Sequence, residues 1–471
     1  MALWRKLLIT MNTYNEKYAE CTTKELNNIT FRNTLQKVFY DNWKKRENFY
    51  SLEVIFSPKC NQGCTYCYLN KDNQHIYSNQ DFKEEESLKN VRLILEWLKE
   101  MDVAPPQFDI FSGELFAQKV GYDLLEVILN FYDENPDVKK PELFVIPTNG
   151  TFVVNEELAE KVKNYIRRFK EKGTRLALSF SIDGLYASKI TRKYKRNLDY
   201  DLSSSYTDEN FYDKAFQFMA EMDCLPHPMI SPENISVWKE NFLWYEQIME
   251  KYGIKFEELF LLEVRNHNWT SEKIEQYQEF VIFVLEHMRK KYNDDEHFIN
   301  WLTEFTEDNP CLGFNFLSSM LYNQKRAPSC TLGRQLMIRA SDLKVFPCHR
   351  LVYPEFEIGH YYPDEEKVLE FDTVAPELGI AILGYNPKAQ NICSRCILNY
   401  MCMGQCQGAC YETTGEVFTP IPSVCNLIYA RTKTVLKTIE KMGLLNKYLE
   451  HIHNDVLMKN MIYFINNELG E

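Results

Sequence analysis

The chain has 471 residues, of which 45% are hydrophobic and 14% are aromatic. This composition indicates a globular protein with more than one domain and excludes a largely disordered chain. The 54 basic and 67 acidic residues give a formal charge of −13, which argues against nucleic acid as an obligatory partner because a phosphate backbone requires a basic surface. The apolar stretches are shorter than a membrane span, and the first residues lack the pattern of a signal peptide. We therefore expect a cytoplasmic protein that binds neither membrane nor nucleic acid.

The predicted elements begin with a helical extension over residues 1–50, which are polar and aromatic. From residue 51 onward, strand patterns alternate with helix patterns. The predicted strands cover residues 52–56, 108–111, 143–146, 176–182, 226–230 and 259–264. The predicted helices cover residues 88–98, 124–132, 158–169, 211–222, 242–252 and 274–288. Six successive strand–helix units indicate an α/β fold with a parallel sheet and helices outside it. Since a full barrel needs eight units, we expect a partial (β/α)6 barrel over residues 51–300.

Small polar clusters follow each predicted strand. In barrels of this kind, the functional residues gather at the C-terminal ends of the strands. The clusters in this chain are residues 60–67, 112–114, 148–150, 183–184, Asn234 and residues 263–266. Because all six occupy equivalent positions, we expect one functional rim.

Three cysteines follow the first predicted strand. Cys60, Cys64 and Cys67 are separated by three residues and then two, and Tyr66 precedes the last of them. Three thiolates this close can bind three irons of a 4Fe–4S cluster and leave the fourth iron open for a small molecule. A structural zinc site would need a fourth ligand, and none is obvious nearby. The motif resembles the signature of the radical S-adenosylmethionine (SAM) enzymes.

This resemblance implies a SAM site beside the cluster. The family's Gly-Gly-Glu-Pro motif holds the SAM amino group, and here it is matched by Ser112, Gly113 and Glu114, with Leu115 in place of the proline. Glycine allows close backbone approach, and the carboxylate can accept a hydrogen bond from the ammonium. Arg192 lies near the family's arginine for the SAM carboxylate, and Lys193 competes for that role. The other residues assigned to cofactor binding are Tyr66, Asn149, Ser179, Ser181, Asp183 and Asn234.

A second group of cysteines lies in the last third of the chain. Zinc is the general alternative for such spacings, but seven cysteines exceed one tetrahedral site and fall one short of two. The pattern resembles the SPASM domain, which follows radical SAM barrels and carries auxiliary 4Fe–4S clusters. The cysteines are Cys330, Cys348, Cys393, Cys396, Cys402, Cys406 and Cys425.

The resemblance implies two auxiliary clusters within residues 310–426. In that family the first two cysteines flank a β-hairpin, and the glycine usual before the second is Leu343 here. One cluster would then be held by Cys393, Cys396, Cys402 and Cys425. The other would be held by Cys330, Cys348 and Cys406, with either Cys311 as fourth ligand or an open iron that contacts substrate.

Three further residues are candidates for catalysis. His349 directly follows Cys348, where sulfatase-maturating relatives have a catalytic aspartate. A histidine there can take a proton or hydrogen-bond a cluster sulfur. Glu263 and Arg265 are two apart on the last predicted strand and so face the same way. They either form a salt bridge or bind SAM ribose or substrate.

The resemblance covers about residues 50–426, and residues 427–471 are predicted to form C-terminal helices. It implies an oxidoreductase or peptide maturase that cleaves SAM to a 5′-deoxyadenosyl radical and abstracts hydrogen from a peptide substrate. The product would be a crosslinked or oxidised peptide of ribosomal origin, with flavodoxin or ferredoxin as electron donor. One alternative is maturation of a protein side chain, as in the anaerobic sulfatase-maturating enzymes. Another is a zinc-stabilised binding scaffold without turnover.

Overall fold

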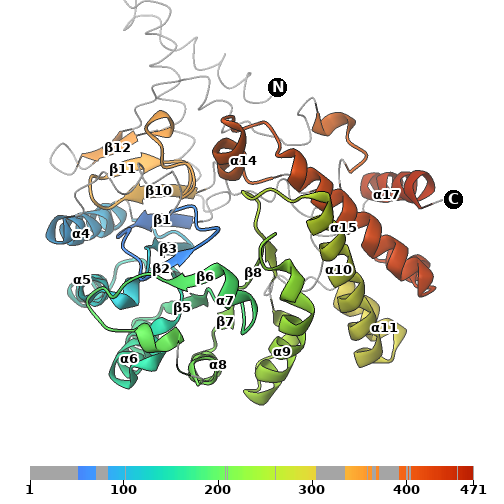
Figure 1. Cartoon of the computed structure of the whole chain (residues 1–471). Coiled ribbons are helices and arrows are strands. Elements are labelled where there is room, and N and C mark those ends of the chain that lie inside the picture. The colour runs from blue at the N-terminus through green and yellow to red at the C-terminus, as the bar shows by residue number, and fades with distance from the viewer. Residues whose placement is uncertain are drawn as a thin grey trace, which may run out of the picture.

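A computed structural model describes most of the chain from residue 51 onward (Figure 1). The predicted extension over residues 1–50 lies outside the described residues, and so do Cys311 and Cys330. The described residues are 51–69, 83–100, 102–206, 208, 210–259, 261–303, 335–357, 359–362, 368–370, 392–398, 401–402, 405–452 and 455–469.

A nine-stranded sheet contains the first five parallel strands of the predicted barrel. They are β1 (Ser51–Ile55), β3 (Gln107–Phe111), β4 (Leu143–Thr148), β5 (Arg175–Phe180) and β7 (Leu225–Pro226). A separate parallel pair follows, formed by β8 (Met229–Ile230) and β9 (Leu262–Glu263). The predicted fifth strand is thus divided into β7 and β8, because Pro226 and Pro228 have no N–H to donate to a continuous ladder.

Helices cover the outer side of this arc of strands (Figure 1). In α6, Leu158, Val162, Tyr165 and Phe169 are buried at three- to four-residue spacing, and the Asn155 side chain caps the helix through the N–H of Leu158 at 3.1 Å. The six predicted helices are all confirmed. They are α4 (Glu84–Glu100), α5 (Lys119–Glu134), α6 (Glu156–Glu171), α8 (Phe211–Met222), α9 (Trp238–Lys251) and α10 (Ser271–Tyr292).

The sheet continues beyond β1 into the cysteine-rich part of the chain. Strand β10 (Gln335–Arg339) pairs with β1 in parallel, and β11 (Lys344–Phe346), β12 (Gly359–Tyr362) and β13 (Val368–Glu370) extend the sheet in antiparallel order. The predicted hairpin before Cys348 is therefore β10–β11. Leu343 adopts the left-handed backbone conformation there (φ 59°), which is unfavourable for a side chain with a Cβ, while burial of that side chain stabilises it.

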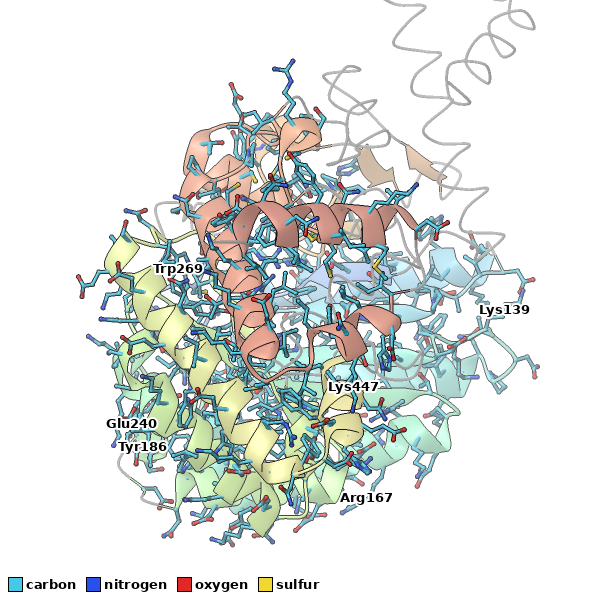
Figure 2. All side chains as sticks on the ribbon, turned by 90° about the vertical axis from the view of Figure 1, so that its right-hand side faces the viewer. Lys139, Arg167, Tyr186, Glu240, Trp269 and Lys447 are labelled. Carbon is cyan, nitrogen blue, oxygen red and sulfur yellow. The ribbon has the colours of Figure 1, made fainter. Side chains whose placement is uncertain are left out.

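Helices form the C-terminal part, as predicted for residues 427–471. They are α14 (Gln407–Thr414), α15 (Pro422–Lys441), α16 (Leu445–Glu450) and α17 (Asp455–Glu468), and α11 (Asp295–Thr303) follows α10. Helix α15 packs along α10, on the side that Figure 2 views with Trp269 and Lys447 labelled. Among the helices of the described segments, none has the length and apolar character needed to cross a membrane.

Candidate functional site

The first three cysteines lie on a loop that leaves the C-terminal end of β1. Its middle forms β2 (Gln62–Cys64), which pairs antiparallel with β6 (Arg192–Tyr194) and places Cys64 opposite Arg192. Burial raises the pKa of the Cys64 thiol to about 12 and raises that of Cys60 further. The charges of Cys64 and Cys67 also raise the pKa of Cys60, and the charge of Cys67 raises that of Cys64. The three sulfur atoms are therefore close enough to influence one another's charge.

Gly113 lets the turn after β3 approach this loop. The N–H of Gly113 donates to the Ser57 carbonyl at 2.7 Å, and the N–H of Glu114 donates to the Lys59 carbonyl at 2.9 Å. A Cβ on Gly113 would lie 2.2 Å from the Lys59 carbonyl oxygen, so a larger residue cannot fit without moving backbone. The close approach of the cysteine loop therefore requires a glycine here, and contact of Gly113 with SAM stays a prediction. Ser112 also donates to the Ser57 carbonyl, at 2.9 Å.

The buried carboxylate of Glu114 accepts hydrogen bonds from three neighbouring residues. Its carboxylate accepts hydrogen bonds from Thr148 Oγ1 at 2.8 Å, from the Asn149 N–H at 2.6 Å and from the Phe116 N–H at 3.2 Å. Its burial is almost complete, and burial raises its pKa to about 7. Glu114 thereby joins the ends of β3 and β4, and its hydrogen bond to a SAM ammonium stays a prediction.

Asp183 and Tyr66 are likewise bound to each other. The Tyr66 hydroxyl lies 2.7 Å and 2.9 Å from the two Asp183 oxygens, and Thr191 Oγ1 donates to the same carboxylate at 2.6 Å. Arg192 Nε lies 3.0 Å from Asp183 Oδ1, and Arg192 Nη1 lies 3.8 Å from Cys64 Sγ. Asp183 and Tyr66 thus hold Arg192 beside the cysteine loop, and their contact with the cofactor stays a prediction.

A cavity of about 270 Å³ adjoins this network. Gln62, whose Oε1 lies 3.5 Å from Cys64 Sγ, forms part of its wall, and so does Arg192. Of the two basic candidates, Arg192 is buried and lines the cavity, whereas Lys193 is exposed. The polar and basic lining residues are Gln62, Asn149, Thr151, Ser181, Ser188, Lys189, Arg192, Ser205 and Asp208, and the aromatic ones are Tyr206, Phe211 and Tyr212.

Two other residues assigned to the cofactor do not line the cavity. Ser179 Oγ lies 3.2 Å from His227 Nδ1, on the neighbouring part of the sheet. Asn234 is fully buried, accepts from the Ser231 N–H at 2.8 Å and from Trp238 Nε1 at 2.9 Å, and donates to the Met229 carbonyl at 3.0 Å. These hydrogen bonds stabilise the turn after β8, and a role of Asn234 in cofactor binding stays a prediction.

His349 lies against the inner side of β1 and β3. The Glu53 carboxylate accepts the backbone N–H of His349 at 3.0 Å, and its other oxygen lies 3.0 Å from His349 Nδ1. The imidazole ring stacks on the Phe111 ring, with 4.3 Å between the ring centres. Asp109, which is next to Glu53 in register, has a pKa raised to about 7, first by burial and then by the Glu53 charge. The sequence did not point to Glu53 or Asp109, although charged residues alternating with apolar ones in a predicted barrel strand could have done so.

Glu263 is held by the C-terminal part of the chain. Its carboxylate accepts from Arg431 Nη1 at 2.6 Å and from the Tyr277 hydroxyl at 2.5 Å. The nearby charges of Arg431 and Arg265 lower its pKa, although burial opposes them. The predicted partner Arg265 therefore contributes charge nearby, while the direct ion pair is made by Arg431 on α15.

The second cysteine group comes together around the start of α15. Burial, together with the neighbouring thiols of Cys402, Cys393 and Cys396, raises the pKa of Cys425 to about 12, although part of Cys425 stays accessible. We call Cys393, Cys396, Cys402 and Cys425 the four-cysteine centre, and their binding of one cluster stays a prediction. None of the described cysteines forms a disulfide.

Two further cysteines, Cys348 and Cys406, lie near a buried ion pair. Arg350 is held by Glu412, with Nε at 3.1 Å from Oε1, and its guanidinium lies 5.1 Å from the ring centre of Tyr68. The Cys406 thiolate charge, which opposes the effect of burial, raises the pKa of Arg350. Arg350 thus lies between the segment after Cys67 and the segment of Cys406.

Within the described segments, no three His, Cys, Asp or Glu side chains converge tightly enough to hold a single metal ion. A 4Fe–4S cluster holds its thiolates farther apart, since each binds a different iron. The thiolates of both cysteine groups are donors that either an iron–sulfur cluster or zinc can bind.

The comparisons with known proteins address the fold. No model of a known protein family matches the chain. The structure is similar over 84% of this chain and 99% of the other to anSMEcpe solved with bound AdoMet, with a TM-score of 0.53 and 13% identity. The chain therefore shares its fold with anSMEcpe. Streptococcus suis SuiB bound to S-adenosylmethionine matches with a TM-score of 0.41 and 13% identity, over 81% of this chain and 77% of SuiB.

One curated sequence also matches. The uncharacterized protein MJ0907 of Methanocaldococcus jannaschii is 29% identical over 137 residues, which are 29% of this chain and 40% of that protein. The cysteine loop after β1 and the cavity beside it lie at the C-terminal ends of the parallel strands, where barrels of this kind carry their functional sites.

Proposed function

We propose that this chain is a radical SAM enzyme that binds a 4Fe–4S cluster at Cys60, Cys64 and Cys67 and SAM in the neighbouring cavity. The observation that carries this proposal is the contact between cavity and cysteine loop, since Gln62 and Arg192 line the cavity and approach Cys64 Sγ. When bound, the cluster and SAM would supply a 5′-deoxyadenosyl radical that removes a hydrogen atom from substrate.

The cavity lining suits a zwitterionic nucleoside such as SAM. Arg192 and Lys189 can bind its carboxylate, and Tyr206, Phe211 and Tyr212 offer aromatic surface to its adenine. Asn149 and Ser181 offer polar atoms for its ribose or amino group. Asp183 fixes Arg192, so that binding energy is not spent on ordering that side chain.

The four-cysteine centre is proposed to hold an auxiliary 4Fe–4S cluster. The second auxiliary cluster is proposed on Cys348 and Cys406, with Cys330 and Cys311 as its other ligands. These clusters would take up the electron that is released when the substrate radical is oxidised.

The proposed substrate is a peptide or a protein side chain, and the proposed electron donor is a flavodoxin or ferredoxin. His349 is the candidate proton acceptor, because Glu53 fixes its Nδ1 side and leaves Nε2 as the nitrogen away from that carboxylate. The resemblance to peptide-modifying SPASM enzymes favours a crosslink or an oxidation of a ribosomally made peptide over the aldehyde chemistry of sulfatase maturation, for which the aspartate is replaced by His349.

SAM binding can be tested without turnover. The anaerobically reconstituted protein should bind SAM, and Arg192→Met should weaken that binding at least tenfold, while Lys193→Met should leave it unchanged because Lys193 points to solvent. Equal binding by the Arg192 variant with its iron intact would contradict the proposed site. Zinc without labile sulfide in the purified protein would instead favour a binding scaffold.

A further inference from the structure

Gln405 joins the four-cysteine centre to the start of α15. It lies between Cys402 and Cys406 and is 7% exposed. Its Oε1 accepts the N–H of Ile421 at 2.8 Å, and its Nε2 lies 3.1 Å from the Ile421 carbonyl oxygen. The same Nε2 lies 3.1 Å from Cys425 Sγ. The side-chain amide therefore has partners on both its oxygen and its nitrogen.

The orientation of this amide follows from the backbone of Ile421. A side-chain amide can be turned over without changing its shape, so its orientation must be decided from its partners. With the amide reversed, an NH2 group would face the Ile421 N–H and a carbonyl would face the Ile421 carbonyl. The Ile421 carbonyl also accepts the N–H groups of Val424 and Cys425, so the Ile421 N–H decides the orientation. It requires Oε1 on its side, and this leaves the second N–H of Nε2 directed at the cysteine sulfur.

Cys425 is well placed to transmit this hydrogen bond to a cluster. It is one of the four proposed ligands of the four-cysteine centre, and its Sγ lies 3.1 Å from Gln405 Nε2. Reduction of a 4Fe–4S cluster adds negative charge, part of which resides on the cysteine sulfurs, so a donor to sulfur stabilises the reduced state more than the oxidised one.

We propose that Gln405 is a positioning residue that donates a hydrogen bond to Cys425 Sγ and raises the reduction potential of the four-cysteine centre. This inference rests on the proposed auxiliary cluster at that centre. A higher potential would make the centre a better acceptor of the single electron that the substrate-derived radical loses.

The test is a potentiometric titration followed by electron paramagnetic resonance on the full chain. Replacing Cys60, Cys64 and Cys67 with alanine removes the SAM-binding cluster, and the signal altered by Cys425→Ser identifies the four-cysteine centre. In this background, Gln405→Met keeps the side-chain length and removes the donor. We expect it to lower the equilibrium constant for reduction at least tenfold, which is about 59 mV for one electron.

Gln407→Met is the matched control. Gln407 is 2% exposed, and its Nε2 donates to the Gln405 carbonyl at 2.9 Å, whereas no hydrogen bond to a described cysteine is present. We expect its potential to equal that of the unsubstituted protein. A Gln405→Met protein with full iron and sulfide and an unchanged potential would overturn the role of Gln405. A Cys425→Ser change without effect on iron or signal would instead overturn the auxiliary cluster.

A second measurement decides the question if Gln405→Met fails to retain its cluster. The otherwise unsubstituted chain, labelled with 15N in its glutamine side chains and reduced, should show a weak 15N hyperfine coupling at this centre. The Gln407→Met protein should keep that coupling. Its absence from the labelled chain would overturn the proposed hydrogen bond.

Discussion

The buried pair of Asp183 and Arg192 gives the sharpest test of how the site is built. The two side chains are 0% and 8% exposed, and Arg192 Nε lies 3.0 Å from Asp183 Oδ1. Asp183 also accepts from Tyr66, Thr191 and the Met229 N–H, at 2.6 to 3.0 Å. The two partners are therefore not equivalent. Without Arg192, Asp183 still accepts hydrogen bonds from three donors. Without Asp183, Arg192 loses the carboxylate with which it pairs within the described residues.

This asymmetry predicts unequal costs in the free energy of unfolding. Asp183→Asn leaves a buried guanidinium without a counter-charge and should cost about 3–5 kcal/mol. Arg192→Met leaves a carboxylate that still has three donors and should cost only about 1–3 kcal/mol. In the double variant the unpaired charge is gone, so its cost should fall below the sum of the two single costs by about 2 kcal/mol.

Urea unfolding of the four proteins in this mutant cycle measures these values. Asp223→Asn is the control, since its pair with Arg175 is 59% and 94% exposed and should contribute no more than about 1 kcal/mol. Equal costs for the two single substitutions, or a double variant whose cost equals their sum, would refute the view that Asp183 serves mainly to hold Arg192.

Three other predictions address charge, packing and metal content. Burial raises the pKa of Asp109 from 3.8 to about 7, so the folded state binds more protons than the unfolded state between these values, and stability should fall as pH rises through them. The free energy of unfolding of Asp109→Asn, measured in urea, should therefore rise relative to that of the unsubstituted protein by up to about 4 kcal/mol between pH 4 and pH 8. A difference between the two proteins that stays constant over this range would contradict the prediction. Gly113→Ala should lose iron from the first cysteine loop, because the new Cβ would lie 2.2 Å from a carbonyl oxygen. Gly63→Ala should retain its iron, because the nearest atom to its Cβ would be 3.7 Å away. Equal iron content in the two variants would contradict the packing argument. Cys425→Ser should lower the iron and sulfide content of the protein. Cys224→Ser should change only its stability, because Cys224 is packed in the hydrophobic core. Loss of iron from Cys224→Ser would contradict this prediction.

Much of the fold follows from periodicity in the sequence. The helices over α4 to α10 have apolar residues at three- to four-residue spacing, and the strands before them are short apolar runs. The break between β7 and β8 was also readable, because Pro226 and Pro228 lie within the predicted strand. The cysteine groups were visible from spacing alone.

The roles of the buried polar residues were not readable, because their partners are distant in sequence. Tyr66 and Asp183 are 117 residues apart, and Glu53 and His349 are 296 apart. A motif indicates that Glu114 is special, but only the fold reveals that Thr148 and the Asn149 backbone take its oxygens. The same holds for Gln405, whose orientation depends on the backbone of Ile421.

The most direct test of the central claim is 5′-deoxyadenosine production by the anaerobically reconstituted and reduced protein, with SAM present. The control is the variant in which Cys60, Cys64 and Cys67 are all alanine. The account predicts 5′-deoxyadenosine and methionine from the unsubstituted protein and none above background from the control. Equal amounts from both, or none from a protein that holds iron and sulfide and binds SAM with its peptide substrate present, would contradict it.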